Sequence, residues 1–275
     1  MNYIFIDASY FIFYRYYSLK KWFKFKYPES IDANNNPIDF DNLIMHKEFN
    51  EKFNDINNYL LKIIHKLKIE QPYKIIFAKD CSRCNIWRTK LYPNYKATRA
   101  ENNEISKVFK FFYDNFKVPA KKYNYTLISH VSLEADDIIG TITLNLINNS
   151  PDKFKNIYIF TDDLDYLQLN CADNIHIYNL KLNNICSKSI GDYKKDLQLK
   201  ILTGDKSDNI PPIHPKCGIK TAIKYIEKPE LLYELFNKKP EYKLNYDKNK
   251  QLIDMNLIAD KYKTAINSTF NKLNI

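Results

Sequence analysis

The chain has 275 residues, a formal net charge of +10 and a hydrophobic fraction of 45%. This length suffices to bury a core without a partner chain, so we expect a monomer with one large domain or with a smaller second one. The charged fraction of 27% is near the globular average and excludes a disordered tail. The positive charge favours a polyanionic partner, because lysine and arginine release the counterions condensed on nucleic acid.

Cysteine use and hydropathy limit the compartment. The five cysteines have no regular spacing, which argues against a secreted disulfide framework. The start, MNYIFIDASYF, lacks the features of a signal peptide, and no apolar run approaches the roughly 20 residues that cross a bilayer. We therefore expect a soluble intracellular protein.

Three short apolar runs are typical of buried strands, because each is rich in β-branched and aromatic residues and ends at an acid. They are YIFIDAS at 3–9, YKIIFAKD at 73–80 and IYIFTDDLD at 157–165. Helical spacing appears between them at 45–67 and at 133–147, where Ser132 could cap the helix. Strands that alternate with helices predict an α/β fold with a mainly parallel central sheet flanked by helices.

The rest of the chain has weaker signals. Residues 28–41 have the composition of an exposed loop. Residues 80–125 are rich in lysine, arginine and aromatic residues, and we expect them to project from the sheet as helices. Beyond Leu202 the pattern becomes helical and basic, which places a domain boundary near residue 200.

Acidic residues follow the predicted strands. Asp7, Asp80, Asp163 and Asp165 would emerge at the carboxyl ends of the strands, where parallel sheets bind ligands. Aspartate also follows strands simply because it stabilises turns and helix N-termini. Three strands in succession make convergence at one edge the better interpretation.

Two further acid clusters, LEADD and GDKSD, accompany TDDLD. Glu134 and Asp137 fall on one face of the predicted helix, with Asp136 beside them. Acids in a first helical turn can simply complement the helix dipole, but this does not explain three clusters in a basic chain. Massed carboxylates repel unless a cation neutralises them, and hard oxygen ligands select Mg²⁺ or Mn²⁺. Two such ions can activate water and stabilise the leaving oxygen of a phosphodiester, which indicates a nuclease.

Five blocks between residues 3 and 222 resemble the flap endonuclease and 5′-to-3′ exonuclease family, which includes the 5′-nuclease domain of bacterial DNA polymerase I and stand-alone phage enzymes. The blocks are IFIDAS, FAKD with WRTKLYPNYKATR, LEADD, TDDLDYLQL, and TGDKSDNIPP with GIKTA. The segment YDKNKQLIDMNLI at 246–258 is similar to phage-type members. The resemblance implies a PIN-like nuclease core at 1–200 with a helical arch at about 81–125. It also implies a helical DNA-binding region with a helix-two-turn-helix motif at 201–275.

The resemblance implies two Mg²⁺ ions, or Mn²⁺ in their place. The family pattern D-x-D-x-x-Q-L leaves Asp162 outside the ligand set. Four acids (Glu134, Asp136, Asp163 and Asp165) would lie close to one ion, and Asp205 and Asp208 would help to hold a second. The full set of implied metal ligands is Asp7, Asp80, Glu134, Asp136, Asp137, Asp163, Asp165, Asp205 and Asp208.

Basic residues are implied near the chemistry. Lys96 and Arg99 lie three apart, on one side of a predicted helix, and match the family pair that contacts the scissile phosphate. Without the motif, they would be an ordinary exposed pair. Tyr95 could stack on a base or be a packed aromatic residue. Related chains usually carry an arginine one position before Arg15, so a phosphate role for Arg15 is not expected. The residues expected to contact nucleic acid are Arg88, Tyr95, Lys216, Gly218, Lys220 and Thr221.

Residues 209–222 resemble the family hairpin that grips duplex DNA through main-chain N–H groups, often with a bound K⁺. Here Pro212 replaces an expected glycine, His214 is an apparent insertion, and only Gly218 remains of the PGIG pattern. We therefore expect weaker main-chain contacts, with charge from Lys216 and Lys220 in their place, and we keep K⁺ as a candidate ligand.

The function we expect is hydrolysis of phosphodiesters near 5′ ends in branched, nicked or gapped DNA, or in RNA–DNA hybrids, during replication or repair. The alternatives are a non-catalytic DNA-junction binding protein, an RNA exonuclease with the same acidic core, and a phosphatase, for which no nucleophile motif is present. Cys81 and Cys84 have a spacing used for zinc but lack a second pair, so we interpret them as loop residues. The tail NSTFNKLNI carries no evident sliding-clamp motif.

Overall fold

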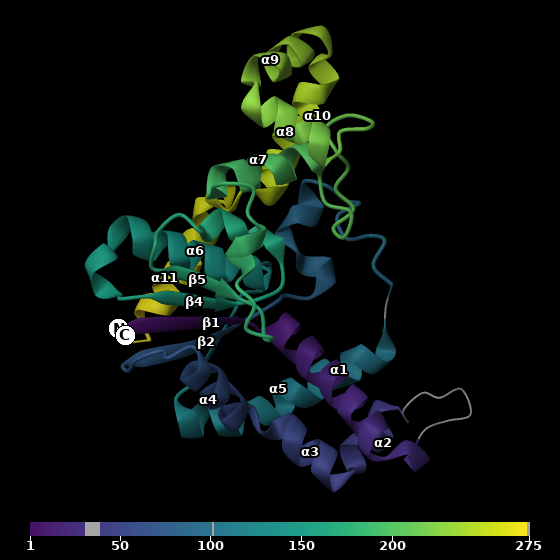
Figure 1. Cartoon of the computed structure of the whole chain (residues 1–275), viewed down its shortest axis with the longest axis vertical. Helices are drawn as coiled ribbons and strands as arrows, with labels where there is room; N and C mark the ends of the chain where they lie inside the picture. The colour runs from purple at the N-terminus through teal and green to yellow at the C-terminus, as the bar shows by residue number, and fades with distance from the viewer. Residues whose placement is uncertain (31–38, 101, 274–275) are drawn as a thin grey trace.

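A five-stranded parallel sheet forms the centre of the protein (Figure 1). The computed structural model describes residues 1–30, 39–100 and 102–273. The strand order is β3-β2-β1-β4-β5, and each neighbouring pair runs parallel, which confirms the predicted α/β fold. The strands are Asn2–Asp7 (β1), Tyr73–Lys79 (β2), Thr126–Ser129 (β3), Ile157–Phe160 (β4) and Ile175–Tyr178 (β5).

The sequence predicted β1, β2 and β4 but not β3 and β5. The two missed strands, TLIS and IHIY, have four residues each and include polar ones, whereas β4 is equally short but apolar or aromatic throughout and is followed by acids. Along β1, Tyr3 and Phe5 join the core on one face of the sheet, and Ile4 and Ile6 join the core on the other. Burial on both faces explains why the central strands are almost continuously apolar.

Two helices cover the first face of the sheet, α6 (Ala135–Asn149) and α11 (Asp260–Asn271) (Figure 1). Ile142 of α6 and Phe270 of α11 are buried in the same core as Phe5. The last helix therefore belongs to the core of the sheet, so the boundary expected near residue 200 does not separate all the later helices from it.

The opposite face is covered by helices from the first half of the chain. The single helical stretch expected at 45–67 is two helices, which follow a third that ends at Met45. Asp55 separates the two by capping the second of them, where its side chain accepts from the Asn58 N–H at 3.3 Å. Phe40 begins a helix and is buried, so the predicted exposed loop is wrong at that end, and residues 31–38 lie outside the described residues. These helices are α1 (Ala8–Lys26), α2 (Phe40–Met45), α3 (Lys47–Asn54), α4 (Ile56–Lys66) and α5 (Asn103–Tyr123).

The region expected to project as helices is divided. Its first part is made of short 3₁₀ helices, η2 (Arg83–Asn85) and η3 (Trp87–Lys90), and of turns. Its second part is α5, whose Phe112 and Phe116 pack against Phe77 of β2. The expectation of projection is therefore wrong for α5, which belongs to the cover of the sheet.

Four helices form a lobe at one end of the molecule (Figure 1). They are α7 (Tyr193–Thr203), α8 (Ile219–Glu227), α9 (Pro229–Lys238) and α10 (Pro240–Ile253). Leu202, Ile213 and Ala222 are buried in a small core of its own.

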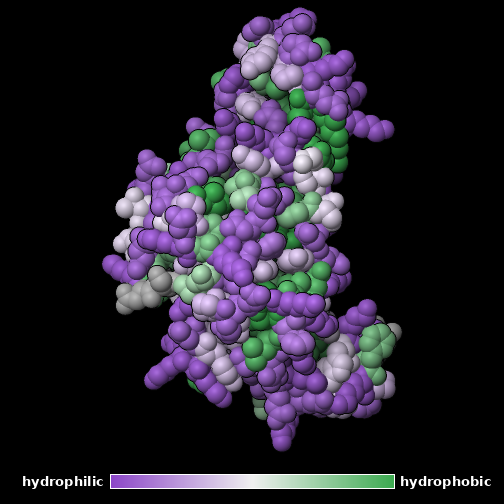
Figure 2. Space-filling model, turned by 60° about the vertical axis from the view of Figure 1, so that its left-hand side comes forward, coloured by the Kyte–Doolittle hydropathy of each residue, from purple (hydrophilic) through white to green (hydrophobic). Residues whose placement is uncertain are grey.

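Hydrophilic residues predominate on the face of the whole molecule shown in Figure 2. None of the described helices is long and apolar enough to span a bilayer. The remaining 3₁₀ helices are η1 (Pro28–Ser30), η4 (Pro151–Lys153), η5 (Leu164–Leu169), η6 (Ile185–Lys188) and η7 (Met255–Leu257).

Gly204, which ends α7, has backbone angles that only glycine adopts readily, φ +67° and ψ −168°. A Cβ at this position would lie 2.3 Å from the Ile210 carbonyl oxygen. We expect Gly204→Ala to lower the free energy of unfolding by about 2–4 kcal/mol, measured by urea denaturation. Gly218→Ala is the matched control, because its φ is −89° and its Cβ would enter open space. A Gly204→Ala protein as stable as the control would contradict the prediction.

Candidate metal centre

Acidic side chains meet at the carboxyl ends of the central strands. Asp7 ends β1, Asp80 follows β2 and Asp163 follows β4. The strand order reverses between the adjacent strands β1 and β4, which is where open α/β sheets bind ligands. Asp7 and Asp163 also cap the segments that follow them, so the expected convergence and the simple turn-stabilising role both occur here.

A cavity of about 480 Å³ occupies this crevice. Among the described residues, its lining includes eight acidic and three basic side chains. Seven of the nine predicted metal ligands line it, and the two that do not are Asp137 and Asp165. The acidic residues are Asp7, Asp80, Glu134, Asp136, Asp162, Asp163, Asp205 and Asp208, and the basic ones are Lys96, Arg99 and Lys200.

The start of α6 explains the position of Asp137. Glu134 is the N-cap residue, and its own N–H donates to Asp137 Oδ2 at 3.0 Å, which forms a reciprocal capping box. The predicted cap by Ser132 is therefore wrong. Asp137 is fully buried and also accepts from Trp87 Nε1 at 2.9 Å. Its carboxylate is committed to the helix start and to the core beneath the cavity.

Arg88 lies beneath the acid cluster and is only 3% exposed. Its guanidinium donates to Glu134 at 3.0 Å and pairs with Asp137 at 2.8 Å, while Nε donates to the Leu252 carbonyl at 2.7 Å. The predicted nucleic-acid contact by Arg88 is therefore wrong, because the side chain is enclosed. It instead fixes the acids at the start of α6 and fastens the end of α10 to them.

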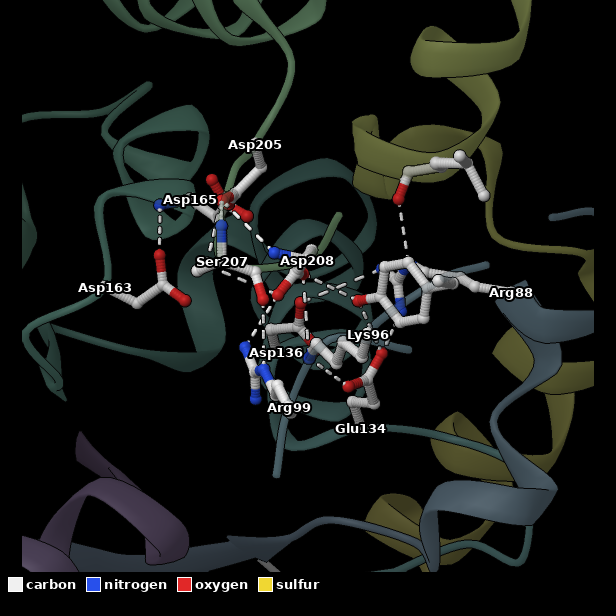
Figure 3. Close-up of polar contacts among 12 residues, drawn as sticks. Arg88, Lys96, Arg99, Glu134, Asp136, Asp163, Asp165, Asp205, Ser207 and Asp208 are labelled. Atoms are coloured by element: carbon white, nitrogen blue, oxygen red, sulfur yellow. Dashed lines mark hydrogen bonds and ion pairs between the residues drawn. The ribbon is translucent and has the colours of Figure 1, made fainter. Parts of the chain in front are cut away.

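Lys96 and Arg99 reach the cavity from a turn. The expected helix is wrong, since Lys96 has a left-handed backbone with φ +55°. The Lys96 ammonium pairs with Glu134 and lies 3.6 Å from Asp208, and Arg99 Nη2 lies 2.6 Å from Asp208 Oδ1 (Figure 3). Both cations are thus held by carboxylates at the cavity that is lined with acids.

Tyr95 is buried, with its ring in a cluster that includes Ile201 and Leu252. Its hydroxyl lies 2.9 Å from Glu134 Oε2 and 2.8 Å from Asp208 Oδ2. The predicted contact with a base is wrong, and the alternative of a packed aromatic residue is correct. The hydroxyl joins a carboxylate of α6 to one of the loop after α7.

The sequence blocks LYPNYKATR and GDKSDNIP contact each other directly. The Lys96 N–H donates to the Asp208 carbonyl at 2.9 Å, and Arg99 Nε donates to the Ser207 carbonyl at 3.1 Å. The Asn209 side-chain amide donates to the Asn94 carbonyl at 2.8 Å. These bonds fix the turn that carries the basic pair against the loop that carries the last two acids.

Lys200 on α7 was not among the predicted site residues. Its ammonium lies 2.6 Å from Asp165 Oδ1 and 2.6 Å from Asp205 Oδ2. Asp165 was expected beside Glu134, but its carboxylate oxygen groups with those of Asp205 and Asp208. A lysine one helical turn before the GDKSD block was visible in the sequence. Only the packing of α7 against η5 brings it between the acids.

The remaining predicted residues lie away from the cavity. Lys216, Gly218, Lys220 and Thr221 lie just before α8 or in its first turn, and all but Thr221 are exposed. The Gly218 N–H already donates to the Lys216 carbonyl at 2.9 Å.

Three further residues, Arg15, Cys81 and Cys84, were not expected to belong to the site. Arg15 is buried, where it donates to the Phe53 carbonyl at 3.1 Å, in keeping with the absence of a phosphate role. The two candidate metal-ligand groups found among the described residues contain carboxylates only and do not include Cys81 or Cys84.

Burial and mutual repulsion raise the pKa values of several of these acids. Burial, followed by the charge of Asp136, raises the pKa of Glu134 to about 7. Burial, followed by the charge of Asp163, raises the pKa of Asp165 to about 7. Burial raises the pKa of Asp7 well above its ordinary value, and Asp80 adds to this. Burial alone would raise the pKa of Asp205 too, but the hydrogen bond from Lys200 lowers it.

The donor set suits a divalent cation. Oxygens of Glu134, Asp136 and Asp137 come within 4.8 Å of one another, and so do oxygens of Asp165, Asp205 and Asp208. Hard oxygen donors in excess over resident cations are what Mg²⁺, Mn²⁺ and Ca²⁺ prefer, and an added cation would remove the repulsion that raises the pKa values.

Comparison with known proteins agrees with this arrangement. A family model described as 5′-3′ exonuclease, N-terminal resolvase-like domain, matches residues 2–198. The chain belongs to this 5′-3′ exonuclease family. A 5′-3′ exonuclease of Buchnera aphidicola subsp. Schizaphis graminum is 32% identical over 186 residues, which are 65% of this chain and 61% of that protein. A DNA polymerase I of Streptococcus pneumoniae is 30% identical over 187 residues, which are 63% of this chain and 20% of that protein. The match thus spans less than two thirds of the length of these relatives.

Solved structures show that the family fold extends over nearly the whole chain. A 5′-exonuclease of T5 with bound zinc ions has a TM-score of 0.62 at 16% identity, over 98% of this chain and 99% of that chain. The flap endonuclease of bacteriophage T5, in a pseudo-enzyme-product complex with DNA and metal ions, also has a TM-score of 0.62 at 16% identity, over 98% of each chain. The expected PIN-like α/β fold is therefore confirmed.

Loss of Arg88 should destabilise the protein far more than loss of an exposed arginine. Arg88→Met leaves Glu134 and Asp137 buried without their counter-charge, and we expect the free energy of unfolding to fall by about 3–5 kcal/mol. Arg83→Met, at an exposed position in the same segment, should change it by less than about 1 kcal/mol. Chemical denaturation measures both, and equal losses would argue against the buried role of Arg88.

Divalent ions should stabilise the protein more above neutral pH than below it. The folded-state pKa values of Glu134 and Asp165, about 7, exceed the unfolded values near 4. Between these limits the folded state binds more protons, so the metal-free protein loses stability as pH rises. We expect Mg²⁺ to raise the melting temperature by about 4–8 °C at about pH 8 and by under about 2 °C at about pH 5. Melts in a chelator, with ionic strength matched by KCl, are the control, and equal shifts at both pH values would contradict the prediction.

Proposed function

We propose that this chain is a divalent-metal-dependent 5′ nuclease. Its substrates are phosphodiesters near 5′ ends in branched, nicked or gapped DNA, and RNA in RNA–DNA hybrids. The observation that carries the proposal is the single cavity in which seven of the predicted acids meet the Lys96 and Arg99 pair. Relatives named 5′-3′ exonuclease and DNA polymerase I support it and favour a role in replication or repair.

We propose two Mg²⁺ ions, held by the two groups of carboxylates. Glu134 and Asp136 of the first group would hold one ion together with Asp163, which follows β4, because Asp137 is committed to the start of α6. Asp165, Asp205 and Asp208 would hold the other. When bound, such ions supply an activated water and neutralise charge on the leaving oxygen.

Lys96 and Arg99 are the groups of the chain that would meet the scissile phosphate. Each is held at the cavity by a carboxylate, so an entering phosphodiester competes with Glu134 and Asp208 for them. The Arg99 side chain is 45% exposed and that of Lys96 only 13%, so the phosphate would meet Arg99 first. Preorganised cations of this kind stabilise the negative charge that develops on the phosphoryl oxygens in the transition state.

Duplex DNA would lie along the lobe beyond the cavity. The exposed side chains of Lys216 and Lys220, with Thr221, are candidates for contacts with its backbone. The Gly218 N–H already donates to the Lys216 carbonyl, which supports the expectation that main-chain contacts with the DNA backbone are weak. A K⁺ ion at this hairpin stays a prediction, which a comparison of duplex affinity in KCl and in NaCl would test.

Two alternatives predict other outcomes in one assay. Labelled 5′-flap, nicked, single-stranded and RNA–DNA hybrid substrates are incubated with the protein, with and without Mg²⁺. A nuclease of the proposed kind shortens the DNA substrates from the 5′ end only with Mg²⁺. A junction-binding protein shifts their mobility without cleavage, and an RNA exonuclease cuts the RNA strand alone.

Replacement of Asp163 should separate cleavage from binding. Asp163→Asn removes a carboxylate that lines the cavity from the proposed ion site, so we expect cleavage of a 5′-flap substrate in Mg²⁺ to fall at least about a hundredfold while binding to the flap persists. Asp162→Asn is the neighbouring control, since that carboxylate contacts Asn179 and Lys188 rather than the other acids. Cleavage by purified Asp163→Asn at the rate of the control would rule out the assignment of this ligand.

A further inference from the structure

Lys200 lies where a divalent ion would bridge two carboxylates. Its ammonium nitrogen is 2.6 Å from an oxygen of Asp165 and 2.6 Å from an oxygen of Asp205. These two acids, with Asp208, form one of the two groups whose oxygens approach within 4.8 Å. A cation is therefore already present between two of the three acids of this group.

The other group of acids is paired with Lys96, at Glu134, and also with a cation of a different kind. Arg88 pairs with Glu134 and Asp137, but its guanidinium is enclosed and also bound to the Leu252 carbonyl. It cannot leave without breaking the contact between α6 and the end of α10. Arg88 is a fixed part of the fold, so it does not exchange with an ion.

Lys200 has the freedom that Arg88 lacks. Its side chain is 24% exposed, is unbranched and lies on the wall of the open cavity. The ion pairs found for it among the described residues are with Asp165 and Asp205 alone. Movement of the ammonium end of the side chain would break these two ion pairs without displacing the backbone of α7.

The ammonium and a divalent ion compete for the same oxygens. Without an ion, Lys200 relieves the repulsion among buried acids, and the metal-free centre needs this relief because water solvates those acids poorly. An ion that binds Asp165 and Asp205 must first replace two short ion pairs. The affinity of this group for the ion is therefore lower than its three carboxylates alone would give.

We propose that Lys200 is a built-in counter-ion that holds Asp165 and Asp205 in place and that a divalent ion must displace to bind there. Displacement leaves the ammonium on the cavity wall, as a third positive charge beside Lys96 and Arg99. Lys200 is a positioning residue in this scheme. The inference deepens the proposed function, on which its catalytic meaning rests, but ion binding alone can test it.

The test is Mn²⁺ binding to the 275-residue chain without DNA, with the free Mn²⁺ measured by electron paramagnetic resonance. Lys200→Met removes the charge and keeps most of the length. We expect a weaker class of site in the wild type to tighten by about tenfold or more in this variant, while the tighter class is unchanged. The metal-free variant should also melt at a lower temperature than the wild type, and Mn²⁺ should restore most of the difference.

Two controls isolate the charge at this position. Lys200→Arg keeps a cation between the acids and should leave the weaker class weak. Lys195→Met removes an exposed lysine of the same helix, whose ammonium lies 3.8 Å from Asp192, and should change neither binding nor melting. If Lys200→Met does not fold without metal, Lys200→Gln provides the neutral variant, since its amide still donates hydrogen bonds.

Unchanged or weaker Mn²⁺ binding in a folded neutral variant would overturn the proposal, and so would tightening by Lys195→Met. A wild type with a single class of site that the neutral variants leave unaltered would overturn it as well. Failure of the proposed function is a separate result. If the chain cuts no nucleic acid but its Lys200 variant binds Mn²⁺ more tightly, the counter-ion proposal is supported and the nuclease proposal is contradicted.

Discussion

The repulsion between carboxylates crowded into one crevice is the constraint on which the rest of the structure depends. The parallel sheet brings acids from the ends of β1, β2 and β4 together, and α6 and the loop after α7 add more. Four basic side chains reach these acids from outside the sheet, Arg88, Lys96, Arg99 and Lys200. They tie the stretch from η3 to Arg99, and helix α7, to the centre, so the ion pairs that neutralise the acids also hold separate parts of the fold together.

The cations differ in how firmly they are held, and this difference orders the chemistry. Arg88 is enclosed and permanent, whereas Lys96, Arg99 and Lys200 border the cavity. The resting protein thus satisfies its acids internally. Under the proposed function, divalent ions bind the carboxylates, and the phosphate binds the cations that those carboxylates release. Each ligand therefore raises the affinity for the other, because both replace the same ion pairs.

Sequence reasoning succeeded where the signal was local. The strands around Asp7, Asp80 and Asp163 could be predicted because a buried apolar run that ends at an acid needs no knowledge of distant contacts. It failed for Arg88, whose burial depends on a carbonyl more than 160 residues later in the chain. It also failed for Lys200, because nothing near it in the sequence shows that α7 packs beside η5.

The return of α11 to the sheet has a consequence for how the chain folds. Its Phe270 and Ile266 complete the core that supports α6, the helix whose first residues are the acids of the centre. The lobe of α7 to α10 is consequently an insertion: the chain leaves the core of the sheet before α7 and returns to the same core in α11 (Figure 1). Contacts of such wide sequence separation form late. During synthesis the protein can therefore complete this core only after its final helix has left the ribosome.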